Sequence, residues 1–164
     1  MRKNLKRILI ALGVVFLGIQ LVPVNRTNPP VDQSMTFQAK VNVPPYIDQI
    51  VRRSCYDCHS HESVWPWYSY IAPSSWLVSG DVQNGRSLLN FSNWDYTMFR
   101  SVGRLDQMAE EIYQDRMPLP IYLVMHPGAK LSTAEKDTLI GWVDIIREEI
   151  MNQPEEPDTT AANK

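Results

Sequence analysis

The stretch Cys55-Tyr56-Asp57-Cys58-His59 decides how the rest of the chain is interpreted. It contains both cysteines of the 164 residues, spaced C-x-x-C and followed directly by a histidine. Each thiol in this pattern can add across one vinyl group of haem, and the histidine can then ligate the iron from one side. The spacing therefore predicts one covalently attached haem c, with Cys55 and Cys58 as thioether positions and His59 as the proximal ligand.

Three other interpretations of the two cysteines stay open. A Cys55–Cys58 disulfide of the thioredoxin type requires a preceding strand in a βαβ unit. A zinc site requires two further ligands, for which His61 and His126 are available besides His59. The cysteines can also be buried structural residues that precede a histidine by chance.

The composition favours one small helical domain. A hydrophobic fraction of 44% and a mean hydropathy of −0.27 suit a globular body, and 164 residues suit one domain. Seven glycines against twelve prolines do not favour strands bounded by glycine turns. We therefore expect an all-α, haem-binding domain over residues 45–152, between a linker at 25–44 and a disordered tail at 153–164.

The first 24 residues differ from this body. A basic flank of Arg2, Lys3, Lys6 and Arg7 precedes a nearly unbroken apolar run over residues 8–24. This pattern predicts an N-terminal transmembrane helix over residues 1–24, and an uncleaved signal anchor is favoured over a removed signal peptide. The positive-inside rule then places the haem domain in the periplasm, on a bacterial inner membrane.

The rest of the chain is acidic. Four of the 16 lysines and arginines lie in the basic flank, so 12 remain against 18 aspartates and glutamates. This balance disfavours a nucleic-acid partner. The partners we expect are the membrane, through the N-terminal helix, and a redox protein that the sequence does not identify.

Helical patterns account for most of the expected domain. Pro45 can open a helix that runs into the cysteines, and further helices are predicted at residues 74–89 and 96–114. The stretch Met117-Pro118-Leu119-Pro120 breaks the last of these and begins a loop that continues through His126. The final helix is predicted from a capping box and from an apolar stripe: Ser132 with Glu135, and Leu139, Val143, Ile146 and Ile150.

The ligand at the sixth iron position decides the function. A methionine sulfur raises the reduction potential toward that of an electron carrier, whereas an open position admits small molecules. Met117 is the preferred distal ligand because the two prolines that follow it stiffen its loop and reduce the entropy lost on ligation. Met125 and His126 are the alternatives, and an open sixth position is a fourth possibility.

Aromatic residues follow the motif closely, and Trp65, Trp67 and Tyr68 are expected to line the haem pocket. The sequence shows no acid–base pair, activated nucleophile or phosphate-binding loop. Single-electron transfer is therefore favoured over an enzymatic reaction. The alternative function is a haem-based sensor of small molecules, or a peroxidase-like protein, with an open or exchangeable sixth position.

In the order of its motifs the chain resembles small class I cytochromes c, and more closely a family of short, membrane-anchored bacterial haem-binding domains. The resemblance covers about residues 45–152. It implies a cytochrome c-like fold, covalent haem on Cys55 and Cys58, His59 as proximal ligand and Met117 at the distal position. In simple cytochromes c the ligand methionine lies closer to the final helix, as Met125 does here. The matching stretches are Cys55-Tyr56-Asp57-Cys58-His59-Ser60, Trp65-Pro66-Trp67-Tyr68-Ser69, Asn90-Phe91-Ser92-x-Trp94, Met117-Pro118 and His126-Pro127-x-Ala129-x-Leu131-Ser132.

Overall fold

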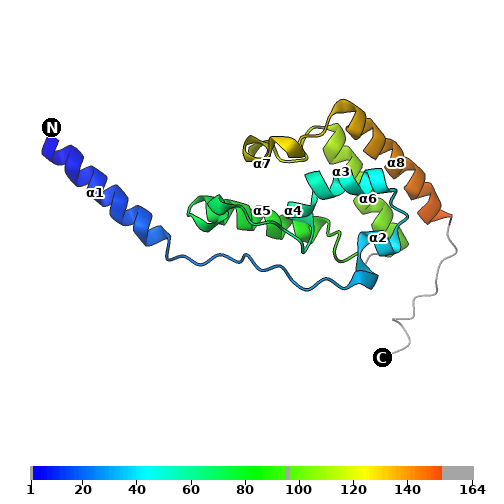
Figure 1. Cartoon of the computed structure of the whole chain (residues 1–164), viewed down its shortest axis with the longest axis horizontal. Coiled ribbons are helices and arrows are strands. Elements are labelled where there is room, and N and C mark those ends of the chain that lie inside the picture. Colours follow the sequence, from blue (N-terminus) through cyan, green and yellow to red (C-terminus); the bar gives the residue numbers. More distant parts are fainter. Residues whose placement is uncertain (1, 95–96, 153–164) are drawn as a thin grey trace, which may run out of the picture.

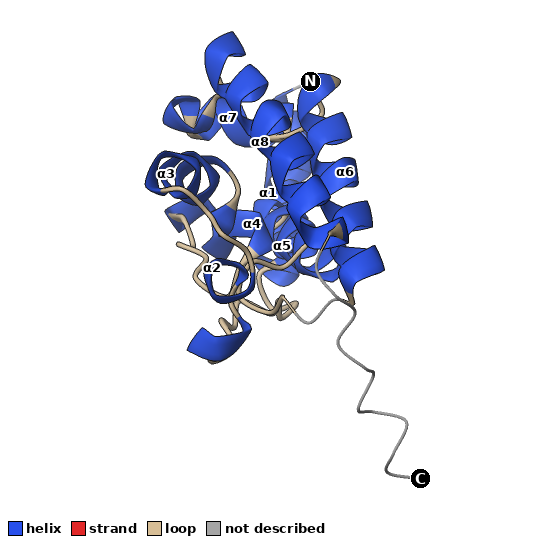
Figure 2. Ribbon diagram, turned by 90° about the vertical axis from the view of Figure 1, so that its right-hand side faces the viewer, coloured by secondary structure: helices blue, strands red, loops and turns tan. Residues whose placement is uncertain are grey.

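The computed structural model describes residues 2–94 and 97–152. Every regular element in these two ranges is a helix, which confirms the all-α prediction (Figures 1 and 2). The helix α1 extends away from a body that the other helices form (Figure 1). In chain order the elements are α1 (Arg2–Ile19), η1 (Gln33–Met35), α2 (Phe37–Lys40), α3 (Pro45–Ser54), α4 (Tyr56–His59), η2 (Trp67–Tyr70), α5 (Ser74–Leu88), α6 (Met98–Tyr113), α7 (Pro120–Met125), η3 (Pro127–Ala129) and α8 (Thr133–Met151).

The core lies where α6 and α8 pack against each other and against aromatic residues from earlier segments. Phe37 of α2 is fully buried, and its ring centroid lies 4.4 Å from that of Trp94 and 5.8 Å from that of Trp142. Burying one such side chain stabilises the fold by about 1.5–3 kcal/mol. The buried residues of the two helices are Leu105, Met108 and Ile112 from α6, and Leu139, Trp142, Val143, Ile146 and Ile150 from α8.

The final helix begins at the predicted capping box. The Ser132 side chain accepts a hydrogen bond from the Glu135 backbone N–H, and the Glu135 carboxylate accepts one from the Ser132 N–H at 2.8 Å. Arg53 of α3 adds an ion pair of 2.8 Å to Glu135. The predicted apolar stripe is buried along the helix, so both parts of this prediction are confirmed.

Replacing Glu135 with alanine is expected to lower the free energy of unfolding by about 1 kcal/mol at pH 7, because the cap and the ion pair are both lost. The hydrogen bonds from Ser132, followed by the contact with Arg53, lower the pKa of Glu135 from 4.5 to about 2. A carboxylate whose pKa is depressed in the folded state contributes stability above its unfolded pKa. That contribution disappears as the pH falls from 4.5 toward 2.

Urea unfolding of wild type and Glu135→Ala at pH 7 and pH 3 measures this effect. The exposed Glu149, near the other end of α8, provides the matched control Glu149→Ala, which should differ from wild type by less than about 0.5 kcal/mol. A difference between wild type and Glu135→Ala that was as large at pH 3 as at pH 7 would contradict the expectation.

The segment predicted as a linker, residues 25–44, is packed against the domain. Phe37 belongs to the core, and its N–H donates to the Phe91 carbonyl at 2.8 Å. Residues 25–31, which we call the N-terminal strap, are held by Arg86 of α5. The Arg86 guanidinium donates to the Thr27 carbonyl at 2.8 Å and to Asn28 Oδ1 at 2.7 Å. Residues 25–44 therefore pack against the body through specific contacts, although their prolines and polar residues are typical of a linker.

No helix in the described parts of the chain has both the length and the apolar character that crossing a bilayer requires. This finding contradicts the predicted transmembrane helix, the membrane as a partner, and the single-pass inner-membrane location with a periplasmic domain. The reason lies in the bounds of α1, which includes all four basic residues and ends at Ile19. Its uncharged part, residues 8–19, is about 18 Å long, against a hydrocarbon thickness of about 30 Å.

The two middle helices match their predictions closely. The helix expected at 74–89 is α5, and the one expected at 96–114 is α6. Tyr96, the predicted first residue of the second helix, lies outside the described residues, as does the predicted disordered tail from residue 153. Gly80 and Gly85 both lie inside α5, and Gly85 has a packing role described below.

The expected loop after α6 is wrong in one respect, because it contains a short helix. Pro120 occupies the first turn of α7, where its missing N–H is not needed and its fixed φ suits a helix. α6 has already ended at Tyr113, so Pro120 starts α7 and does not end α6. The segment 117–125, formed by the Met-Pro stretch and α7, runs past the cysteine motif, as the contacts below show.

Candidate functional site

The cysteine motif lies at a break between two helices. α3 ends at Ser54, Cys55 has non-helical backbone angles (φ −126°, ψ −33°), and α4 forms a single turn. The Cys55 carbonyl accepts the N–H groups of Cys58 at 3.2 Å and His59 at 3.0 Å. We call this arrangement the motif turn (residues 55–59). It brings the two thiols and the imidazole together on one short piece of backbone.

The orientation of His59 is fixed by α5. Its Nδ1 lies 3.0 Å from the Gly85 carbonyl oxygen and 3.0 Å from the Leu89 carbonyl oxygen. A carbonyl only accepts, so Nδ1 carries the proton and Nε2 keeps its lone pair. Removal from water lowers the pKa of His59 below 6.5, although the two hydrogen bonds act in the opposite direction. The side chain is therefore a neutral imidazole with Nε2 as the nitrogen that can bind a metal.

Gly85 allows this contact between α5 and the motif turn. A Cβ atom at this position would lie 2.6 Å from the Cys58 carbonyl oxygen and 3.1 Å from its carbon. Both are backbone atoms, so no side chain can rotate to make room. The absence of a side chain at Gly85 thus sets how closely the carbonyl groups of α5 approach His59.

The two cysteines are free and half-buried. Removal from water, followed by the neighbouring Cys58, raises the pKa of Cys55 to about 12. Removal from water and the charges of Asp57 and Asp81 raise the pKa of Cys58 to about 11. Redox-active cysteines have depressed pKa values instead, because they react as thiolates. The environment of the motif turn therefore does not favour a redox-active thiol pair.

A cavity of about 180 Å³ lies on one side of the motif turn. Cys55 and His59 line it, and so does Met117, the preferred distal ligand, from the segment that follows α6. The structure thus brings three of the predicted site residues to one cavity. Its remaining walls are formed by Ser54, Leu88, Leu89, Arg104, Gln107, Met108, Glu111, Ile112, Pro118 and Leu131.

A larger cavity of about 440 Å³ lies beside Cys58. Its aromatic wall contains Trp65, Trp67 and Tyr68, the residues expected to line a haem pocket, and Met125 lines it from α7. The buried indole Nε1 of Trp65 has no hydrogen-bond partner among the described residues. Further walls are formed by Asp57, Ser63, Val64, Pro66, Ser74, Leu77, Val78, Asp81, Val82, Leu119, Ile121, Tyr122 and Val124.

A hydrogen bond joins α7 to the motif turn. The Tyr122 hydroxyl donates to Asp57 Oδ2 at 2.6 Å, and removal from water together with this bond raises the pKa of Tyr122. His126 stacks on the Tyr122 ring, with centroids 4.1 Å apart, and its Nδ1 lies 3.3 Å from the Tyr68 hydroxyl oxygen. His126 is therefore held by aromatic neighbours and lines neither of the two cavities described above.

A family model described as a haem-binding domain matches residues 14–145, which is most of the 164-residue chain. The chain belongs to the haem-binding domain family. No curated protein and no solved structure matches it significantly. The matched range begins within α1 and ends within α8, so the haem-binding domain includes the N-terminal strap, the motif turn and both cavities.

The residues of this haem-binding domain fit a haem. Two thiols and an imidazole with an available nitrogen share one turn, and the larger cavity, which Cys58 lines, is mostly apolar with an unpaired N–H donor from Trp65. The alternatives from the sequence fit less well. Within the residues that the structure describes, no group of three His, Cys, Asp or Glu side chains could hold a metal ion. The same residues form no strand, which a thioredoxin-type unit requires.

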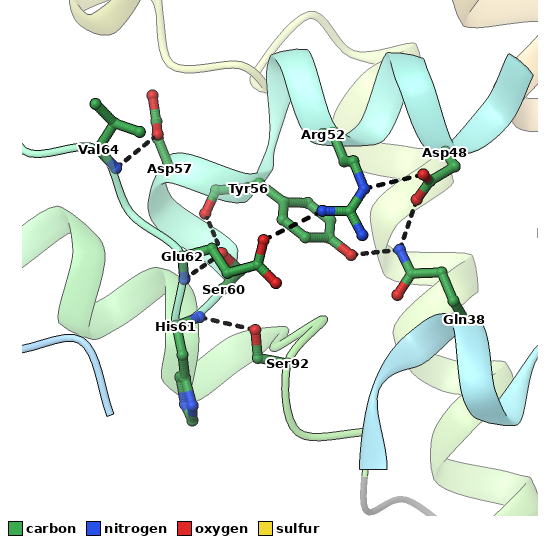
Figure 3. A network of polar contacts seen from close by, with 10 residues as sticks. All are labelled: Gln38, Asp48, Arg52, Tyr56, Asp57, Ser60, His61, Glu62, Val64 and Ser92. Atoms are coloured by element: carbon green, nitrogen blue, oxygen red, sulfur yellow. Dashed lines mark hydrogen bonds and ion pairs between the residues drawn. The ribbon is translucent and has the colours of Figure 1, made fainter. Parts of the chain in front are cut away.

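Polar residues directly before and after the motif turn have structural partners in the haem-binding domain (Figure 3). Arg52 donates to Asp48 at 2.9 Å and to Glu62 at 3.2 Å. The His61 N–H donates to the Ser92 hydroxyl at 2.9 Å, and His61 Nε2 lies 2.9 Å from Asn90 Nδ2. His61 thus holds the loop that precedes Trp94.

Sequence reasoning missed Asp57 and Tyr122 as residues of the haem-binding domain's site. Asp57 is an unspecified position of the C-x-x-C-H pattern, and Tyr122 was expected in a loop. The one available signal was the location of Asp57 between the two cysteines. Its partner 65 residues away along the chain could be found only in the folded structure.

Proposed function

We propose that this haem-binding domain carries one covalent haem c on Cys55 and Cys58, with His59 as proximal and Met117 as distal iron ligand, and that it transfers single electrons. When bound, the haem supplies one-electron iron chemistry at a potential that depends on its axial ligands. The chain's own residues attach, orient and enclose it.

The observation that carries this proposal is the environment of His59. Two carbonyl groups hold its Nδ1–H, which fixes the tautomer and the ring orientation and raises the basicity of Nε2 as a ligand. Its depressed pKa keeps the imidazole neutral at pH 7, so no proton competes for Nε2. A histidine with a packing role alone would not require hydrogen bonds at Nδ1 that fix its tautomer and ring orientation.

The choice of Met117 among the distal candidates is supported by its location. Met117 lines the same cavity as His59 and Cys55, whereas Met125 lines the other cavity and is 51% exposed. His126 stacks on Tyr122, and its Nδ1 also lies 3.3 Å from the Tyr122 carbonyl oxygen. Met117 is thus the candidate that shares a cavity with the proximal histidine.

Covalent attachment is tested by mass spectrometry and a pyridine haemochrome spectrum. The protein would be expressed in a host that contains c-type haem maturation enzymes. We expect wild type to gain the mass of one haem that acid–acetone extraction does not remove. Cys55→Ser and Cys58→Ser should each retain one thioether at most, and the double variant should have none. A wild-type chain of unmodified mass would refute the thioether proposal.

The distal ligand is tested on the same material with Met117→Ala and its matched control Met125→Ala. Loss of the sulfur-to-ferric-iron charge-transfer absorption in Met117→Ala alone, with a lower midpoint potential, is expected. If the absorption is lost only in Met125→Ala, Met125 is the ligand. If reduced wild type binds carbon monoxide at once, the sixth position is open, and the sensor or peroxidase-like function replaces electron transfer.

A further inference from the structure

We propose that Tyr122 is a positioning residue: its hydrogen bond to Asp57 is a latch that keeps the segment 117–125 closed over the motif turn and so keeps external ligands from the sixth iron position. This inference rests on the proposed function, because it assumes that Met117 in the same segment ligates the iron.

The latch joins two parts of the chain that carry the site. Asp57 lies between the two thioether cysteines, and Tyr122 lies in α7, between Met117 and Met125. The distance from the Tyr122 hydroxyl oxygen to Asp57 Oδ2 is 2.6 Å, which is typical of a strong hydrogen bond between a hydroxyl and a carboxylate. A single bond therefore connects the distal segment to the backbone turn that bears the proximal ligand.

The acceptor of the latch is itself held in place. The other carboxylate oxygen of Asp57 accepts the Val64 N–H at 3.1 Å, and the Asp57 carbonyl accepts the Ser63 hydroxyl at 2.6 Å. These two hydrogen bonds restrict the Asp57 side chain even when Tyr122 is not bound to it. A preorganised acceptor loses less entropy when the latch closes.

Little else holds α7 against the motif turn. The helix contains no buried residue, and its main packing neighbour is the η3 turn that directly follows it. Four of its six residues are exposed, namely Pro120, Ile121 at 59%, Val124 at 75% and Met125 at 51%. Opening α7 would remove one wall of the larger cavity, and the hydrogen bond from Tyr122 to Asp57 is a polar contact that opposes this opening.

The test compares Tyr122→Phe with the matched control Tyr113→Phe. Phenylalanine keeps the aromatic ring that stacks on His126 and removes only the hydroxyl group. Tyr113 is 74% exposed at the end of α6. Two readouts apply to the haem-loaded, full-length protein: hydrogen exchange of the amides of residues 121–125, and the rate at which imidazole binds to the ferric form.

We expect both rates to rise about tenfold or more in Tyr122→Phe, because a hydrogen bond to a charged group is lost. Both the hydrogen-exchange rate and the imidazole-binding rate of Tyr113→Phe should equal those of wild type. Asp57→Asn retains an acceptor without the charge and should lie between the two. This graded response would not follow if Tyr122 only filled space.

Two outcomes overturn the inference. Equal hydrogen exchange in Tyr122→Phe and Tyr113→Phe would show that no latch exists. Faster exchange without faster imidazole binding would show that α7 does not guard the iron. Mass spectrometry of the same samples reports covalent attachment, so failure of the proposed function is recognised separately.

Discussion

Replacing Gly85 with alanine is expected to lower the free energy of unfolding by about 3 kcal/mol and to reduce haem binding. The new Cβ would lie 2.6 Å from the Cys58 carbonyl oxygen and 3.3 Å from the Cys58 Cβ. Backbone atoms cannot rotate away, so α5 must shift from the motif turn, and overpacking of this kind typically costs about 1–3 kcal/mol. The shift also moves the Gly85 and Leu89 carbonyl groups away from His59 Nδ1.

Gly80 provides the matched control for this substitution. It lies in the same helix, and a Cβ atom added there meets nothing within 4 Å. Gly80→Ala should therefore raise the free energy of unfolding by about 0.5–1 kcal/mol through helix propensity alone. Urea unfolding of both variants, with haem absorbance per mole of protein as a second readout, makes the comparison. Equal stabilities of the two variants would refute the close contact between α5 and Cys58.

Replacing Arg86 with alanine is expected to destabilise the domain by about 3 kcal/mol. Beyond its bonds to the strap, the guanidinium donates to the Ser60 carbonyl at 2.7 Å and to the Ser63 hydroxyl at 3.0 Å. Arg86 thus joins the N-terminal strap to the residues directly after the motif turn. Its removal leaves several acceptors without a donor, and a half-buried unsatisfied group costs free energy.

The matched control is Arg100→Ala, since Arg100 is exposed and its Nε lies 3.5 Å from the Thr97 hydroxyl oxygen. We expect a change of less than about 0.5 kcal/mol for this variant. Limited proteolysis adds a local readout, because only Arg86→Ala should make the strap at residues 25–31 sensitive to cleavage. An intact strap in Arg86→Ala would show that other contacts hold it.

The parts of the fold that follow from local rules were predictable from the sequence. The capping box at Ser132 depends on two residues three positions apart, and the α8 stripe depends on helical periodicity. Proline at the start of α3 is an equally local signal. Such features require no knowledge of which segments meet in space.

The parts that depend on long-range contacts were not predictable. The sequence of the strap predicts a linker because its prolines and polar residues have no periodic pattern. In the structure, however, Arg86 binds Thr27 and Asn28, which lie 59 and 58 positions earlier in the chain. The hydropathy of residues 8–24 indicated a membrane span, but where the helix begins and ends decides its length and charge. The motif predicted haem binding, which the family match supports, whereas the division of the site residues between two cavities and the Asp57–Tyr122 hydrogen bond could be found only in the folded structure.

The two residues between the cysteines, Tyr56 and Asp57, connect the motif turn to two different parts of the fold. Tyr56 is buried and stacks on Phe91 with centroids 5.3 Å apart, while Asp57 reaches toward α7. The C-x-x-C-H pattern allows any amino acid at these two positions. In this chain the first is a buried aromatic residue and the second is hydrogen-bonded to α7, so homologues that differ at these positions should differ in how rigidly they hold Cys55, Cys58 and His59.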